Sequence, residues 1–260
     1  MGMLKLLLLF SPLWSLFAIV NGNPGEPALL TNGIICHSPN WSFRIGYMGD
    51  YVYKEQFRDE FEINGCVSTT TFIKLYTNAG LLTFNLKKRL DVYGILGASR
   101  IQIDEEAFSK TRFGWGVGAK AVIYQTKHWI IGADLKYYES DQKPLYFICE
   151  RSAYNIVSDY ELKYYEAQGS LGVTYRTKYI APYINASYIS SRLSPDPAIA
   201  VVRLPSTDYL VDVISKSIIN QERFGLTLGA TLIDQKTMLL SVEWRLINQN
   251  SIDVLGEIRL

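Results

Sequence analysis

The sequence predicts an all-β fold, a transmembrane antiparallel up-and-down β-barrel of about ten strands that follows a signal peptide. Segments of about ten residues alternate apolar and polar side chains, which is the length and pattern of strands that cross a bilayer at a tilt. The connections between these segments alternate between short and long. Beyond the N-terminus, no run of about 18 apolar residues predicts a membrane-spanning helix.

The first 22 residues have the pattern of a signal peptide. Lys5 supplies a positive charge, residues 6–20 are almost entirely apolar, and Gly22 is a small residue of the kind expected before a cleavage site. An N-terminal membrane anchor is the alternative, and the short apolar run with Pro12 disfavours it. We therefore predict a signal peptide over 1–22, an N-terminal periplasmic segment over 23–41 and an outer-membrane barrel over 42–260.

The segment 112–125 has the clearest alternation. Only residues 126–128 separate it from a second alternating segment, which begins at Trp129, so the two are predicted to form a hairpin. The apolar face of the first segment carries Phe113, Trp115, Val117, Ala119, Ala121 and Ile123, and its other face carries Gly114, Gly116, Gly118, Lys120, Val122 and Tyr124.

The same alternation predicts nine further strands. Two additional strands, at 199–203 and 209–214, would raise the count from ten to twelve, and this alternative stays open. The nine strands cover residues 42–53, 77–86, 91–102, 129–137, 165–175, 180–191, 224–232, 238–246 and 251–260.

Connection length predicts how the barrel is oriented. Outer-membrane barrels have short periplasmic turns and longer extracellular loops. We therefore expect both termini in the periplasm and the long loops at the cell surface, although the last turn, at 248–250, is short where a long one is expected. The short turns lie at 87–90, 126–128, 177–179 and 234–236, and the long connections lie at 54–76, 103–111, 140–160 and 192–222.

The aromatic residues favour a membrane barrel over a soluble β-sandwich, which would show the same alternation. Tyr and Trp are enriched where a ring meets both lipid and water. Several aromatic residues lie at predicted strand ends, as in the girdles of membrane barrels: Phe113, Trp129, Tyr165, Tyr175 and Phe224. We therefore expect the apolar faces to contact lipid and the polar faces to contact the lumen.

Charged residues on the polar faces are the candidate pore-lining residues, because rings of charge along a wet pore set ion selectivity. The alternative is that opposite charges pair and fill the lumen, since barrels of about eight strands are filled by their own side chains. The candidates are Arg44, Asp50, Lys54, Lys120, Asp134, Lys136, Glu166, Arg176, Glu243 and Arg245.

The chain has three cysteines, an odd number for an exported protein. Cys66 and Cys149 lie in predicted outer loops, whereas Cys36 precedes the first strand on the periplasmic side. If an internal disulfide forms, we expect it between Cys66 and Cys149, which leaves Cys36 for contacts between molecules. Three unpaired thiols are the alternative.

Composition disfavours several function classes. Without residues 1–22 the chain has 25 basic and 25 acidic residues, so it lacks the basic surface of a nucleic-acid binder. The two histidines, His37 and His128, share no predicted strand with a serine, so we expect no catalytic triad. We likewise expect no metal site and no cofactor.

Four stretches resemble the chlamydial major outer membrane proteins. GNPGEPALL at 22–30 is similar to the start of their mature chains, and FRIGYMGDYV at 43–52 resembles their first strand. KRLDVYGILGA at 88–98 resembles their RFDVF…LGA segment, and VEWRLIN at 242–248 resembles their penultimate strand. This chain is shorter, has fewer cysteines and ends in Leu260 rather than Phe, which puts pore size and a cross-linked coat role in doubt.

The resemblance implies a non-enzymatic porin for passive diffusion of small hydrophilic solutes or ions, with a contribution to envelope structure. The alternative is a non-conducting barrel that stabilises the envelope or acts as an adhesin. The expected partners are outer-membrane lipid, small solutes or ions, further copies of the chain, and envelope proteins linked through Cys36.

Overall fold

The computed structural model describes most of the barrel and part of the segment that precedes it. The predicted signal peptide up to residue 21 lies outside the described part, as do Cys36 and His37. The described residues are 22–30, 33–34, 38, 40–58, 61–63, 66–68, 71–103, 107–149, 152–196, 199–203, 210–214, 217–234 and 237–260.

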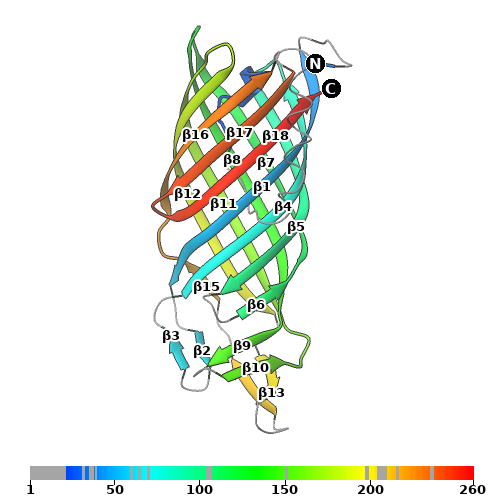
Figure 1. Cartoon of the computed structure of the whole chain (residues 1–260), viewed down its shortest axis with the longest axis vertical. Coiled ribbons are helices and arrows are strands. Elements are labelled where there is room, and N and C mark those ends of the chain that lie inside the picture. Colours follow the sequence, from blue (N-terminus) through cyan, green and yellow to red (C-terminus); the bar gives the residue numbers. More distant parts are fainter. Residues whose placement is uncertain are drawn as a thin grey trace.

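Ten long strands pair antiparallel in a closed circle, so the predicted barrel is confirmed (Figure 1). Closure pairs each wall strand on both sides, which satisfies the backbone groups that lipid cannot hydrogen-bond. In order around the circle the strands are β1 (Trp41–Arg58), β4 (Thr71–Leu86), β5 (Leu90–Ile103), β7 (Arg112–Gln125), β8 (Trp129–Pro144), β11 (Glu161–Tyr175), β12 (Ile180–Asp196), β16 (Phe224–Asp234), β17 (Met238–Leu246) and β18 (Gln249–Arg259).

Six of the first seven of these strands are longer than predicted, and β7 has the predicted bounds. Strands β1, β4, β5, β7, β8, β11 and β12 have 14 to 18 residues, whereas β16, β17 and β18 have 9 to 11. About ten residues are enough to cross a bilayer at a tilt, so the longer strands extend the wall beyond it. Much of each predicted long connection is therefore strand.

Two small sheets stand at the end of the barrel that is opposite the termini (Figure 1). One pairs β2 (Phe61–Ile63) with β3 (Cys66–Ser68). In the other, the segments 199–203 and 210–214 are strands, but they pair with each other, and 199–203 pairs on its other side with residues 152–156, outside the barrel. The twelve-strand alternative is therefore wrong. The second sheet contains β9 (Tyr146–Cys149), β10 (Ser152–Ile156), β13 (Ile199–Arg203) and β14 (Leu210–Ile214).

Two further short strands pair with the ends of long strands that extend beyond their neighbours in the wall. Strand β6 (Ala107–Lys110) pairs with β5 and β8. Strand β15 (Ile218–Asn220) pairs with both β1 and β12. Because β16, β17 and β18 are short, β15 covers edges of β1 and β12 that would otherwise be unpaired.

The turns fit the predicted alternation of connection lengths. Lys87 and Lys88 have φ values of 50° and 57° between β4 and β5, which is typical of the tight hairpin turns that suit twisted strands. At the other end, the turn between β17 and β18 is also tight, as predicted. There Ile247 has a φ of 80°, a strained conformation for a β-branched residue.

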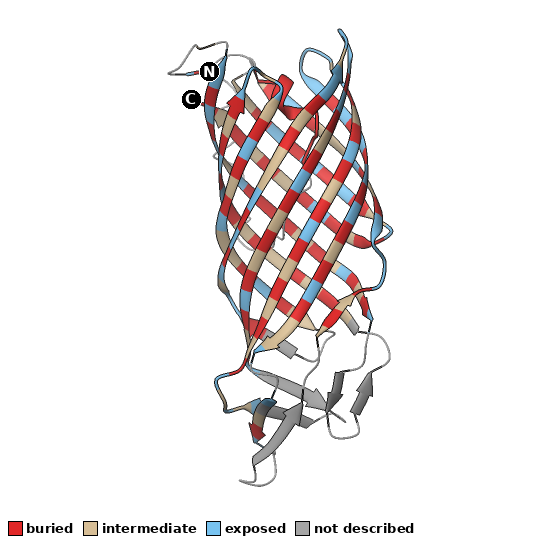
Figure 2. Cartoon of the chain, turned by 180° about the vertical axis from the view of Figure 1, so that it is seen from behind, coloured by how far each residue is buried: buried red, intermediate tan, exposed pale blue. Residues whose placement is uncertain are grey.

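Burial alternates along the wall (Figure 2). The exposed face is the apolar one. Exposed residues include Val92, Val117, Leu135 and Leu171, whereas most inward residues are polar or charged. This is the inverse of a protein that folds in water, and it matches a barrel surrounded by lipid.

The segment 112–125 departs from its predicted alternation at one place. The pairing of β7 with β8 shifts between Val122 and Tyr124, so Ile123 and Tyr124 both point outward. The prediction that Tyr124 lies on the polar face was wrong, because a β-bulge reverses the order of the two faces beyond it.

Four of the five predicted girdle residues, Phe113, Trp129, Tyr175 and Phe224, are exposed on the outer face, whereas Tyr165 is half-buried. Trp129 and Tyr175 pack edge to face with ring centroids 4.8 Å apart, beside the short turns. Phe224, the first residue of the short strand β16, packs on Tyr188 with ring centroids 5.3 Å apart. Such rings fit the two membrane–water interfaces.

The structure describes one helical turn, η2 (Glu26–Ala28). No helix in the described residues is long and apolar enough to cross a membrane.

We expect Val117→Arg to destabilise the barrel in lipid by about 2–4 kcal/mol, because Val117 is outward and exposed on β7. The measurement is the refolding equilibrium in phospholipid vesicles, and Val117→Leu is the control, with a cost near zero. Equal stability of the two variants would contradict a lipid-facing wall. Gly118 is unsuitable as a lumen control, because a Cβ there would lie 2.3 Å from the ring of Tyr93.

Candidate functional site

The interior of the barrel is the candidate functional site, and eight of the ten predicted pore-lining residues point into it. Each of the eight has 5% or less of its surface exposed. They come from β1, β7, β8, β11 and β17, and they are Arg44, Asp50, Lys120, Asp134, Lys136, Glu166, Glu243 and Arg245.

The prediction that Lys54 lines the pore was wrong, because this side chain is exposed on the outer face. The pairing of β1 shifts between Val52 and Glu55, so this bulge moves Lys54 outward and puts Glu55 inside. The Lys54 ammonium lies 4.5 Å from the centre of the Phe72 ring. Arg176 lies in the turn after β11, where it is half-buried at the barrel mouth.

Six further charged residues are buried in the interior. The alternation of 251–260 places Asp253, Glu257 and Arg259 opposite the apolar face of the last strand, so sequence alone could have identified these three. The other three are Asp91 at the start of β5, Glu55 after the bulge in β1, and Glu26 in the N-terminal segment.

Arg245 organises the middle of the interior. Its guanidinium contacts the carboxylates of Asp50 and Asp253, with distances to Asp253 of 2.9 and 3.1 Å. It also donates to Ser251 at 2.6 Å and to the side-chain oxygen of Gln249 at 2.7 Å. A buried cation needs such partners, because desolvation costs several kcal/mol per ion.

Arg44 organises a second cluster nearer the termini. It contacts the carboxylate of Asp91 and that of Glu257, the latter at 2.8 Å from its Nε. It also lies 3.4 Å from the carboxylate of Glu26. Lys120 completes the cluster with an ion pair of 2.6 Å to Glu26.

Tyrosine rings fill the space beside glycines on neighbouring strands. A Cβ at Gly118 would lie 2.3 Å from the Tyr93 ring, and one at Gly229 would lie 2.3 Å from the Tyr183 ring. The phenol of Tyr93 donates to Asp134 at 2.8 Å, and that of Tyr183 donates to Glu243 at 2.8 Å. Each of these tyrosine rings, with the carboxylate that it hydrogen-bonds, thus fills part of the lumen.

Apolar side chains fill the interior toward the long connections. Phe57, Ile73, Ile101 and Ile218 are essentially inaccessible there, at 0–1% exposed. Leu162, Leu193, Tyr160 and Tyr164 belong to the same buried set. This region is a hydrophobic core inside the barrel wall.

The N-terminal segment 22–30 covers the other end of the interior, and all nine of its residues are buried. It lies inside the barrel mouth. Asn23 donates to Thr231 at 3.0 Å and accepts from Thr174 at 2.5 Å. The backbone oxygens of the segment accept hydrogen bonds from side chains of the barrel: Asn185 to Gly22, Asn85 to Pro27, Arg176 to Ala28 and Arg259 to Leu30.

Together these contacts reach eight of the ten wall strands, from β1 through β18. Even Gly132 on β8 approaches the segment, since a Cβ there would lie 2.3 Å from the Pro24 oxygen. Segment 22–30 therefore acts as a lid across the mouth.

Glu26 holds the lid by charge. Burial would raise the pKa of Glu26, but the neighbouring Lys120 ammonium and Arg44 guanidinium lower that pKa from 4.5 to about 2. A folded-state pKa below the unfolded value contributes stability that is complete above about pH 4.5. That contribution is lost as the pH falls toward about 2.

The described interior holds more carboxylates than cations. Nine buried acids are Glu26, Asp50, Glu55, Asp91, Asp134, Glu166, Glu243, Asp253 and Glu257, against five buried bases, Arg44, Lys120, Lys136, Arg245 and Arg259. No group of three or more His, Cys, Asp or Glu in the described residues has metal-ligating geometry. Cys66 and Cys149 lie in strands whose side chains are not described, so the disulfide stays a prediction.

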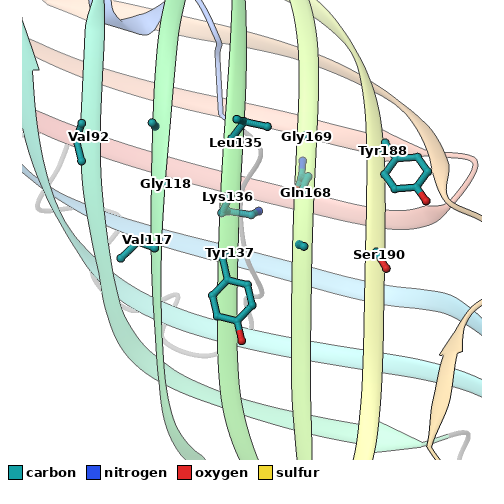
Figure 3. Close-up of a pocket in the computed structure, with 12 residues that line it drawn as sticks. Val92, Val117, Gly118, Leu135, Lys136, Tyr137, Gln168, Gly169, Tyr188 and Ser190 are labelled. Atoms are coloured by element: carbon teal, nitrogen blue, oxygen red, sulfur yellow. The ribbon is translucent and has the colours of Figure 1, made fainter.

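A shallow groove of about 600 Å³ lies on the outer wall over β7, β8 and β11 (Figure 3). Leu135 and Tyr137 flank it, while Lys136 between them points away into the barrel (Figure 3). The groove exists because Ala119, Ala167 and Gly169 present little side chain to the outside. It belongs to the lipid-facing surface and not to the lumen.

We expect Glu26→Gln to weaken docking of segment 22–30 by about 3 kcal/mol at neutral pH, because Lys120 loses its nearest carboxylate. Amide hydrogen exchange at residues 26–29 measures this, with Asp159→Asn, an exposed carboxylate, as the control. Between about pH 4.5 and about 2 the wild-type should approach the variant. Identical exchange in both proteins at neutral pH would refute this role for Glu26.

No protein-family model matches the chain. Full-length relatives are the major outer membrane porins of Chlamydia trachomatis. Those of serovars F and B are each 22% identical, and that of serovar L3 is 23% identical, with 99% of this chain and 99% of each relative covered. The alignment with serovar F extends over 391 residues, so the relatives carry insertions that this 260-residue chain lacks.

Two solved barrels are similar at lower levels. The outer membrane protease OmpT of Escherichia coli is 11% identical with a TM-score of 0.42, covering 85% of this chain and 94% of that one. The translocator domain of NalP from Neisseria meningitidis is 8% identical with a TM-score of 0.45, covering 85% and 88%. The full-length porin matches and the closed barrel lead to one conclusion: this chain is an outer-membrane β-barrel and a distant relative of the chlamydial major outer membrane porins.

Proposed function

We propose that the protein serves in the outer membrane as a closed, non-catalytic barrel that contributes to envelope structure and holds its long connections at the cell surface. In this proposal the barrel conducts no solute while the N-terminal segment and the interior ion pairs stay in place.

The observation that carries the proposal is the burial of the interior side chains. Residues that line a water-filled pore are exposed to water, yet every charged residue inside the described part of the barrel is 5% exposed or less. Ten strands are nearer to the eight whose side chains fill a barrel than to the 16 to 18 of barrels with an aqueous channel. The N-terminal segment, the two ion-pair clusters and the apolar region occupy successive levels of that space.

Passive diffusion of small solutes or ions is the second candidate. It is favoured by the names of the full-length relatives, which are called porins. Under this alternative the interior rearranges, and the charged candidates such as Lys120 and Glu243 then line the path.

Single-channel recording of the refolded protein in planar bilayers separates the two candidates. We expect no resolvable current, because no described interior charge is accessible to water. Retention of the folded, heat-modifiable form on gels is the control for insertion. A reproducible unitary current from the intact chain would favour diffusion.

The orientation of the barrel is tested on intact cells. We expect an epitope tag next to Asp159, whose side chain is 87% exposed near the long connections, to bind antibody. A tag next to Lys127, in the tight turn between β7 and β8, should bind only after the outer membrane is permeabilised. The opposite labelling pattern would reverse the topology.

A further inference from the structure

Three cations on the outer face of the wall gather on adjacent strands and have no acidic partner among the described residues. Lys54 of β1, Lys74 of β4 and Arg100 of β5 lie near the end that carries the long connections (Figure 1). None of the three forms an ion pair with a described acid. Every described acid of β1, β4 and β5 is buried in the interior instead. We call these three residues the cation patch.

Outward cations on the other side of the wall show that ion pairs between strands are available to this protein. Arg112 lies 3.0 Å from Glu161, and Lys163 lies 2.5 Å from Asp196. Lys143 also contacts a carboxylate. The cation patch therefore differs from these cations in lacking a described counter-charge.

The strand register brings the three charges together. The bulge in β1 places Lys54 across from Lys74. Side chains that oppose each other directly have Cβ atoms about 5 Å apart, and like charges there are destabilising. Arg100 pairs with Tyr76, two residues along β4 from Lys74, so Arg100 is a diagonal neighbour of Lys74. The three cations therefore form one repulsive group, which a bound anion would stabilise.

Aromatic rings hold two of these cations on the outer face. The guanidinium of Arg100 lies 5.1 Å from the centre of the Tyr76 ring, and the Lys54 ammonium lies over the Phe72 ring. Tyr51 packs against Tyr76 with ring centroids 4.8 Å apart. Contact with a ring face positions a cation without neutralising its charge. The charges of the patch thus stay available to an anion.

The cation patch begins at the depth of the lipid headgroups. Tyr76 lies about ten residues from the end of β4 at the short turn, and Arg100 lies about ten from the start of β5, which is the length of a strand that crosses a bilayer. Outward residues between these points and the short turn are uncharged, and Leu82 and Leu96 among them are 58% and 64% exposed. The cations therefore lie where the lipid-facing band ends.

We propose that the cation patch binds the phosphate groups of a phosphorylated glycolipid of the outer leaflet. Lys54, Lys74 and Arg100 pair with phosphate oxygens, and the planar guanidinium can donate two parallel hydrogen bonds to one phosphate. Three cations spread over three strands match a headgroup with more than one phosphate better than a phosphodiester of single charge. The choice of leaflet rests on the orientation proposed above, whereas the affinity for phosphate does not.

The test is lipid binding by the refolded full chain in nonionic detergent micelles, followed by native mass spectrometry. The probes are diphosphoryl lipid A, monophosphoryl lipid A and phosphatidylglycerol, each titrated over the same concentrations. We expect one molecule of diphosphoryl lipid A to bind more tightly than either other probe. The measurement requires neither a conducting state nor one orientation, so its failure is distinguishable from failure of the proposed function.

Two single variants remove charge from the patch. We expect Lys74→Gln and Arg100→Gln each to weaken binding of diphosphoryl lipid A about fivefold, which is the contribution of one basic residue at an anionic lipid surface. Lys178→Gln is the matched control, because Lys178 is an exposed lysine that also lies over a tyrosine ring, at 4.9 Å from the centre of Tyr179, beside a short turn. The control should keep the affinity of the wild-type.

Equal wild-type affinity for the three probes overturns the proposal, and so does an equal loss of affinity in Lys178→Gln, since the effect is then one of general surface charge. Without lipid, Lys74→Gln should be at least as stable as the wild-type to denaturant, because it relieves repulsion with Lys54. A clear loss of stability there also overturns the proposal, because a carboxylate of the chain then neutralises the patch. The comparison of probes on the wild-type stands even if a variant fails to fold.

Discussion

The closed hydrogen-bonded wall is the constraint on which the rest of the molecule depends. Lipid offers no partner for backbone N–H and C=O groups, so the sheet must end where it begins, with β18 paired to β1. Ten strands fix the width of the interior. That width is small enough for side chains to span, and tyrosines seated over glycines use the space beside the wall.

Burial of the interior then dictates its electrostatics. Each charge taken from water needs partners, which explains why Arg44 and Arg245 each contact more than one carboxylate. The same requirement accounts for Glu26 inside the barrel mouth, where its carboxylate is a partner for both buried cations, Lys120 and Arg44. The closed interior and the charge network therefore depend on each other, because water in the lumen would raise the local dielectric constant and weaken every ion pair.

Sequence alone predicts the wall for two reasons. Contact with lipid on the outside requires apolar residues at every second position of a strand, and strands that are neighbours in the chain are neighbours in the wall, so the turns between them show in the sequence. It also predicts most interior charges, including Arg44 and Arg245. It fails at Lys54 and Tyr124, because a bulge inserts one residue and reverses the faces beyond it without a sequence signal. The sequence also does not predict that Glu26 is buried in the barrel. Its ion-pair partners are distant in sequence, and no local pattern marks it as an interior residue.

The pairing of β1 with β18 has a consequence for folding. These strands come from opposite ends of the barrel sequence, and the backbone of Leu260 donates to Phe43. Apart from the pairs that β15 makes, every other pair of wall strands joins strands that follow one another closely along the chain. Pairing β1 with β18 closes the longest loop of chain, so it is the pairing with the largest loop-entropy cost. A chain that stops before residue 249 has two unpaired edges, one of them β1, and a free edge recruits other chains. The last strand therefore protects the protein from aggregation as much as it completes the circle.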